Sequence, residues 1–309
     1  MLKNLSRVNK VNIVDVSKPL HDENQYLKLV SDVLTEGVME DGRNGKVLTV
    51  FGSAMHFSLK DNTIPLLTTK KLAWKTCLRE LLWFIRGQTS NEVLKKQNVH
   101  IWDGNASREF LDSRGLTNLK ENDLGAIYGH QWRHFNGKYS NCNADYKDQG
   151  FDQLDYIIKC LKDTKERNSR RLVMSAWNPC QLDEMALPPC HILCQFNVTD
   201  GNKLSCSLYQ RSCDLGLGVG FNIASYSFLT HLIAHHCNLE VLDFYYYLGN
   251  CHIYEQHIEP LREQIIREPY KFPKIVIKNK YEDIISYNVD DFEILDYEFH
   301  PLIKMEMIA

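Results

Sequence analysis

One cysteine stands at the start of a predicted β-hairpin, across from an arginine. Cys190 follows Pro188-Pro189, and because proline cannot donate a ladder hydrogen bond, this pair belongs at the entry of a strand. Asp200-Gly201 is a strong signal for a two-residue turn, and that loop pairs Cys190 with Arg211. A three-residue loop pairs the cysteine with Ser212 instead. Because a guanidinium favours the nucleophilic thiolate, the pattern predicts an activated nucleophile, although a buried structural cysteine near a surface arginine fits it as well.

A carboxyl group lies among aromatic residues on a predicted helix. Three and four positions after Glu80 come Trp83 and Phe84, which share its side of a helix. Burial against these rings would favour the neutral acid and suit proton transfer. A surface glutamate paired with Arg79 or Arg86 fits the same spacing, so both interpretations stay open at this point.

Composition indicates a folded, soluble-type chain. Of 309 residues, 44% are hydrophobic and 24% charged, which supplies enough apolar material for a core and excludes wholesale disorder. The formal net charge of -3 shows no basic surplus, so we expect no nucleic-acid partner. No apolar run reaches about 18 residues, so we expect no membrane span.

Ten cysteines are present, and none forms a C-x-x-C pair. The usual zinc-ribbon and thioredoxin spacings are therefore absent, and we expect no metal site. Disulfide frameworks are typical of short secreted chains, and residues 1–18 contain no apolar stretch like that of a secretory signal. We therefore expect a cytoplasmic protein, with the nucleus as the second reducing compartment, in which most cysteines are small buried apolar residues.

Apolar periodicity predicts helices and strands without regular alternation. The expected helices span 24–36, 74–86, 151–163 and 221–237, the last apolar on nearly every side and therefore buried. The expected strands span 46–59, 171–177, 191–198, 203–210 and 244–254, with Ile192, Cys194, Phe196 and Val198 on one face of the third. No linker divides the chain, so the pattern predicts one α+β domain over residues 21–309 after an N-terminal extension over residues 1–20.

Several multi-residue motifs occur in an order that closely resembles thymidylate synthases. They are Leu187-Pro188-Pro189-Cys190-His191, Tyr209-Gln210-Arg211-Ser212-Cys213-Asp214 and Gly218-Val219-Gly220-Phe221-Asn222. The resemblance runs from about Tyr26 to Ala309. It implies a large mixed, mostly antiparallel β-sheet covered by helices, with the sheets of two subunits packed back to back in a homodimer. It also implies methylation of dUMP to dTMP with 5,10-methylenetetrahydrofolate as co-substrate, releasing dihydrofolate.

The resemblance assigns roles residue by residue. Cys190 would add to carbon 6 of uracil, and Glu80 would relay a proton to the pyrimidine carbonyl. Asn222 would hydrogen-bond the pyrimidine edge, although an N-cap fits its place near a helix start. The remaining catalytic positions are Tyr128, His191 and Asp214.

The same resemblance implies two sets of binding residues. The dUMP set is Arg43, Arg170, Arg171, Gln210, Arg211, Ser212, Asp214, Asn222, His252 and Tyr254, with Arg170 and Arg171 reaching the partner subunit's site. The folate set is Lys70, Ile101, Trp102, Asp214, Gly218, Phe221 and Ala309. Without the resemblance, the arginine pair reads as solvated charges, the histidine and tyrosine as a half-buried pair, and the folate set as core aromatics and a surface lysine.

Three positions depart from the family pattern. An ungapped alignment places Gly42 on the loop arginine, and we assign the phosphate contact to Arg43 because a glycine loop can shift by one residue. Gly220 replaces a proline, which we expect to loosen the turn there, and Asn250 replaces an aspartate.

Three other functions compete with the main interpretation. Nucleotide hydroxymethylases carry aspartate where Asn222 stands, and an amide suits uracil better than cytosine. A non-catalytic nucleotide- or RNA-binding relative would not need Glu80 and Cys190 together. A hydrolase using Cys190 and His191 is geometrically poor, since adjacent strand residues point to opposite faces.

Overall fold

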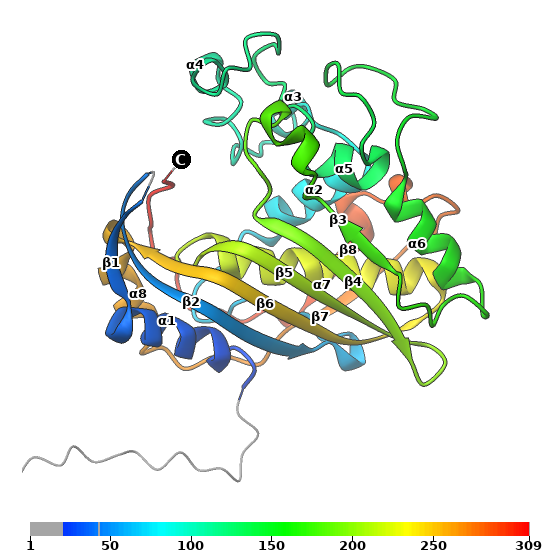
Figure 1. Ribbon diagram of the computed structural model, residues 1–309. Coiled ribbons are helices and arrows are strands. Elements are labelled where there is room, and N and C mark those ends of the chain that lie inside the picture. Colours follow the sequence, from blue (N-terminus) through cyan, green and yellow to red (C-terminus); the bar gives the residue numbers. More distant parts are fainter. Residues whose placement is uncertain (1–20, 43, 309) are drawn as a thin grey trace, which may run out of the picture.

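Six strands form one sheet in the order β1-β2-β6-β5-β4-β3 (Figure 1). The computed structural model describes residues 21–42 and 44–308, so the predicted extension over residues 1–20 lies outside the described residues. Strands β5 and β6 run parallel and every other neighbouring pair in the sheet is antiparallel. The strands span Val38–Gly42 (β1), Gly45–Ser58 (β2), Val173–Ser175 (β3), His191–Thr199 (β4), Lys203–Asp214 (β5) and Glu240–Tyr254 (β6). The expected mixed, mostly antiparallel α+β fold is confirmed.

Helices cover one face of this sheet. The long helix α7 (Gly218–Cys237) connects β5 to β6 and packs on both, which explains why these two strands are parallel. Its residues are buried on nearly every side, as its all-round apolar sequence predicts. The other helices are α1 (Asn24–Glu36), α2 (Trp74–Ile85), α3 (Asn91–Lys95), α4 (Arg108–Ser113), α5 (Tyr128–His134), α6 (Gln153–Lys162) and α8 (Ile258–Gln264). In the described chain no helix has both the length and the apolar character needed to cross a membrane.

The β4–β5 hairpin contains an irregularity that decides where Cys190 lies. Next to the turn Thr199 pairs with Lys203, so the loop has three residues and not two. A register shift between His191 and Leu193 then moves the pairing by one, and His191 faces Gln210. The shift also breaks the expected alternation at the strand's start: Ile192 is only partly buried and does not share the fully buried face of the strand.

The opposite face of the sheet carries exposed aromatic side chains. Phe51 on β2 is 81% exposed, and Tyr247 on β6 is 48% exposed. Tyr209 on β5 pairs directly with Tyr247 and is also exposed. On β6 the buried Phe244 and Tyr246 alternate with exposed tyrosines, which places the latter on the side away from α7.

The C-terminal segment returns to the sheet's helical side. After the short pair β7 (Lys274–Ile277) and β8 (Phe292–Leu295), the Tyr297 hydroxyl donates to the Leu67 carbonyl at 2.6 Å. The His300 amide donates to the Thr68 carbonyl at 2.7 Å. These bonds fix the start of the last segment against the loop that precedes α2.

Candidate active site

A cavity of about 490 Å³ lies at the start of α7, between the sheet, α2 and the C-terminal segment. Most residues that the sequence assigned to a site line it. These are Lys70, Glu80, Ile101, Trp102, Tyr128, Cys190, His191, Gln210, Ser212, Asp214, Gly218, Phe221, Asn222, His252 and Tyr254. They come from segments up to 184 residues apart in the chain (Lys70 to Tyr254), so the fold alone assembles them.

Cys190 lies at the entry of β4, partly exposed toward this cavity. Its main-chain amide donates to the Tyr128 hydroxyl at 2.7 Å, and its carbonyl accepts from the Arg211 amide at 2.9 Å. The Arg211 side chain donates to the carbonyls of Pro188 and Pro189, both at 2.9 Å. The prolines therefore do more than start the strand, because their carbonyls also hold the Arg211 guanidinium.

Glu80 is buried on α2, which confirms the desolvated interpretation over the surface ion pair. Burial raises the pKa of its carboxyl to about 7, and a hydrogen bond from Trp102 opposes that rise. The Trp102 indole N–H donates to Oε1 of Glu80 at 2.7 Å. At neutral pH this carboxyl is close to half protonated, the state that suits a group passing a proton in both directions.

A chain of buried amides sets the direction in which Asn222 points. The Gln210 Nε2 donates to the Ser212 carbonyl at 2.9 Å and to Asn222 Oδ1 at 3.0 Å. Because a main-chain carbonyl only accepts, the nitrogen of the Gln210 amide must face it, and the oxygen of Asn222 must face Gln210. The Tyr246 hydroxyl donates to Gln210 Oε1 at 2.5 Å and satisfies the other end. Asn222 lies within α7, whose N-cap is Leu217, so the N-cap interpretation is wrong.

His191 is buried beside this chain. Burial lowers the pKa of its ring to about 4, so it is neutral at physiological pH. Its ring lies 5.2 Å from the ring centroids of both Tyr128 and Tyr226. A neutral imidazole can orient water or a substrate oxygen, but it is not a cationic site.

Asp214 ends β5 and binds the start of α7. Its carboxylate accepts from the amides of Gly216 at 2.9 Å, Leu217 at 3.2 Å and Gly218 at 3.3 Å. Burial raises its pKa, but contacts with His257 and the Gly216 amide outweigh this, so the net pKa lies below its ordinary value. The carboxylate is therefore ionised at the cavity wall.

Lys70 is buried, which excludes the surface-lysine interpretation. Its ammonium donates to the Gly216 carbonyl. Burial lowers the pKa of Lys70 to about 8, against the opposite influence of Asp214 and Glu23. Glu23, fully buried, accepts from the amides and hydroxyls of Thr68 and Thr69 and fixes the loop that carries this lysine.

Three described residues that the sequence assigned to the site do not line the cavity. Arg170 and Arg171 are exposed beside β3 and do not line it. The Arg211 guanidinium donates to the carbonyls of Pro188 and Pro189 and lies 5.5 Å from the centroid of the Trp177 ring. Arg43 and Ala309 lie outside the described residues.

The two other departures have structural explanations. Asn250 donates to the Thr49 hydroxyl at 2.8 Å and turns its oxygen to Nδ1 of His252 at 3.1 Å, so it offers the ring the same acceptor as an aspartate. Gly220 lies in the first turn of α7, where a Cβ would come within 2.3 Å of Leu67. The missing side chain makes room for Leu67, so Gly220 is a packing position within the helix.

Sequence reasoning missed three contributors to the site. Tyr246 and His257 carried no local sequence signal. Tyr246 contacts the side chain of Gln210, and His257 contacts the main-chain oxygen of Glu306, and both partners are distant in sequence. The donation from Trp102 to Glu80 was missed as well, although the indole and carboxyl were each singled out. Alternation along β6 could have placed Tyr246 on the buried face, but not against Gln210.

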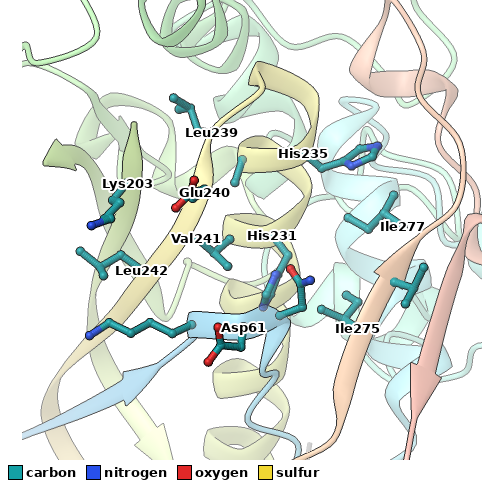
Figure 2. A pocket seen from close by; sticks show the side chains of 14 residues that line it. Asp61, Lys203, His231, His235, Leu239, Glu240, Val241, Leu242, Ile275 and Ile277 are labelled. Carbon is teal, nitrogen blue, oxygen red and sulfur yellow. The ribbon is translucent and has the colours of Figure 1, made fainter. Parts of the chain in front are cut away.

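A second cavity, of about 810 Å³, lies between the C-terminal half of α7 and β7 (Figure 2). No cysteine lines it. Its two histidines already contact main-chain carbonyls: His231 Nε2 lies 2.9 Å from the Thr63 oxygen, and His235 Nε2 lies 2.9 Å from that of Asn279. In the described chain, no group of three or more His, Cys, Asp or Glu side chains could hold a metal ion. The chemistry-bearing residues therefore gather in the first cavity.

Comparison with known proteins agrees with this geometry. A family model for thymidylate synthase matches residues 24–309. Human thymidylate synthase is 51% identical over 291 residues, which cover 94% of this chain and 92% of that protein. Bifunctional dihydrofolate reductase-thymidylate synthases of Leishmania major and Plasmodium chabaudi are each 50% identical, and the match covers 55% and 49% of their lengths. The chain thus spans about half the length of these bifunctional relatives. Because the matches extend over nearly the whole sequence, this chain belongs to the thymidylate synthase family.

Proposed function

We propose that this chain methylates dUMP to dTMP, with 5,10-methylenetetrahydrofolate as co-substrate and dihydrofolate as second product. The observation that carries the proposal is the single cavity that brings Cys190, Glu80 and Asn222 together in a member of this family. Cys190 is the nucleophile that adds to carbon 6 of the uracil ring. This addition makes carbon 5 electron-rich, and elimination of the same thiolate restores the ring at the end.

Glu80 and the buried amides act on the pyrimidine edge. With a pKa of about 7, Glu80 holds or releases a proton near the ring carbonyl at neutral pH. The hydrogen bond from Gln210 holds the oxygen of the Asn222 amide toward Gln210. The amide nitrogen of Asn222 is therefore left to donate to the substrate. A donor suits the uracil carbonyl at position 4 and opposes the amino group of cytosine, which supports dUMP over dCMP.

The residues around Asp214 fit a folate. Bound folate would supply the one-carbon unit and the hydride that completes the methyl group. Trp102, Ile101 and Phe221 give the cavity an apolar wall for a flat ring, and the ionised Asp214 can accept from ring nitrogens. Leu302, Ile303, Met307 and Ile308 of the C-terminal segment complete the wall and limit access of water.

A direct assay tests this proposal. Purified protein is mixed with dUMP and methylenetetrahydrofolate, and the absorbance of dihydrofolate is followed. We expect turnover, its loss in Cys190→Ser, and its retention in Cys180→Ser, a matched change at an exposed cysteine outside the cavity. Turnover of dCMP without turnover of dUMP, or full activity in Cys190→Ser, would contradict the proposal.

We further propose a homodimer in which two sheets meet through their uncovered faces. The exposed side chains of Phe51, Tyr209 and Tyr247 support this, because a monomer rarely leaves such a surface open to water. The exposed Arg170 and Arg171 support the expectation that they serve the partner's site.

Subunit complementation tests the shared site. A Cys190→Ser chain and a chain with Arg170→Ala and Arg171→Ala are unfolded, mixed and refolded together. Random pairing makes about half of the dimers mixed. In a mixed dimer, only the chain with an intact Cys190 receives intact arginines from its partner, so one of the two sites is complete. About a quarter of wild-type activity should therefore return. No recovery from a mixture that forms dimers would refute the sharing of arginines.

We propose that residues 21–309 form one catalytic domain and that residues 1–20 are an extension that catalysis does not require. Deletion of the extension should leave turnover unchanged. We also propose a cytoplasmic or nuclear location, which the ten cysteines support because none of them forms a disulfide in the described chain, and imaging of the tagged chain tests it.

A further inference from the structure

One buried histidine lies between the site and the C-terminal segment. His257, just before α8, is fully buried. Its Nε2 lies 2.7 Å from the main-chain oxygen of Glu306, and its Nδ1 lies 3.8 Å from Oδ1 of Asp214. The ring therefore contacts both the segment that lines the cavity and the carboxylate at the cavity wall.

Nε2 of His257 is within hydrogen-bond distance of the Glu306 oxygen, whereas Nδ1 has no hydrogen-bond partner among the described residues and lies within ion-pair distance of the Asp214 carboxylate. A neutral imidazole carries one N–H, so if it donates to Glu306 its other nitrogen turns a lone pair toward the Asp214 carboxylate. The imidazolium carries two N–H groups and removes this repulsion. The imidazolium is thus the form that fits both neighbours.

Gly216 makes this approach of the ring sterically feasible. A Cβ at Gly216 would lie 2.3 Å from Nδ1 of His257. The same glycine donates its amide to Asp214 and accepts at its carbonyl from Lys70. The turn between β5 and α7 is therefore built around the imidazole and the carboxylate together.

The charged and titratable surroundings of His257 favour its protonation on balance. Burial by itself lowers the pKa of His257, but Asp214 and the Glu306 carbonyl more than offset this, and the net pKa lies above 6.5. The Lys70 charge acts in the opposite direction. From β6, the Tyr254 ring meets the imidazole edge-on at 5.7 Å, and His252, whose pKa burial lowers, also interacts with Asp214.

We propose that His257, as an imidazolium, is a positioning residue that ties the C-terminal segment to Asp214, so that closure over folate depends on one proton. This rests on the proposed function, since folate is the ligand that the closed segment would cover. The charge is present below the pKa of an unfolded histidine and is lost as pH rises through the higher folded value. Folate binding should therefore weaken on the alkaline side.

Steady-state kinetics of His257→Gln test whether His257 links the C-terminal segment to Asp214. Glutamine keeps a donor for the Glu306 carbonyl but carries no charge. We expect the KM for methylenetetrahydrofolate to rise about tenfold at pH 6.5, with the KM for dUMP unchanged and the difference from wild type lost by pH 9. His235→Gln is the matched control, because its Nε2 also contacts a main-chain carbonyl, far from Asp214. An unchanged folate KM, or an equal rise in the KM for dUMP, would overturn the proposal.

Two measurements separate this inference from the proposed function and from misfolding of the variant. Nitrogen-15 NMR of the wild-type protein at pH 6.5 should show both ring nitrogens of His257 protonated, and a single neutral tautomer would overturn the proposal. Carboxypeptidase should shorten the wild-type chain faster at pH 9 than at pH 6.5, after correction for the enzyme's own pH dependence, and equal rates would contradict it. Neither readout requires turnover of dUMP, so a protein inactive toward dUMP would refute the proposed function while these results still decide the role of His257.

Discussion

The buried carboxyl of Glu80 should destabilise the protein as it ionises, and Glu80→Gln should remove that effect. Burial raises its pKa from the ordinary value of 4.5 to about 7, so the folded state retains a proton that the unfolded state has lost. At about 1.36 kcal/mol per pKa unit, this difference corresponds to about 3 kcal/mol. That contribution is fully present below pH 4.5 and is lost as pH rises to about 7.

Glutamine has nearly the same shape as glutamate, and its oxygen can accept from the Trp102 indole, but it does not ionise. The unfolding free energy of Glu80→Gln minus that of wild type should therefore grow between pH 4.5 and 7. Above about pH 8 it should level off near 3 kcal/mol. The variant should be more stable than wild type there and yet nearly inactive, because it cannot relay a proton.

Urea unfolding at matched protein concentration, repeated from pH 5 to pH 9, measures this difference. Glu92→Gln, at an exposed position on α3, controls for the loss of one carboxylate. A stability difference that does not change with pH would refute the reasoning, because it would show that Glu80 ionises as readily in the folded chain as in the unfolded one.

Three further predictions follow from single contacts. Trp102→Phe removes the indole donor to Glu80. Loss of such a bond should raise the carboxyl's pKa by about one to two units, so the limb of the pH–rate profile set by this group should move to higher pH. Tyr246→Phe leaves a buried glutamine oxygen unpaired and should raise the KM for dUMP about tenfold; a KM like that of wild type would show that the tyrosine does not hold the amide in place. Gly220→Ala should destabilise the protein by about 1–2 kcal/mol in urea unfolding, because its clash with Leu67 exceeds the gain in helix propensity, and the same change should cost less in a Leu67→Ala background.

Local chemistry was enough to predict many elements and to place Cys190 at a strand entry. The helices at Asn24–Glu36 and Gly218–Cys237 follow apolar spacing that is visible in a single chain. Proline cannot sit inside a central strand, so Pro188-Pro189 located the strand entry and Cys190 with it. Glu80 could be predicted as desolvated because its aromatic neighbours lie on the same helical face.

Hydrogen-bond partners could not be predicted in the same way. The register shift near His191 separates the pairing set by the three-residue turn from the pairing at the other end of the strand, and hairpin signals alone do not predict it. The parallel β5–β6 pair requires α7 to cross between them, which periodicity does not reveal.

The sequence by itself determined which chemical groups this protein has: one thiol at a strand entry, one carboxyl among aromatic rings, and motifs that resemble a known family. Only the tertiary structure decided which states these groups adopt. Burial sets the pKa of Glu80 and the neutrality of His191, and contacts across more than 40 residues tie His257 to the C-terminal segment. The physical reason is that desolvation and hydrogen-bond direction depend on neighbours brought together by folding, and residue order specifies these neighbours only through the complete fold.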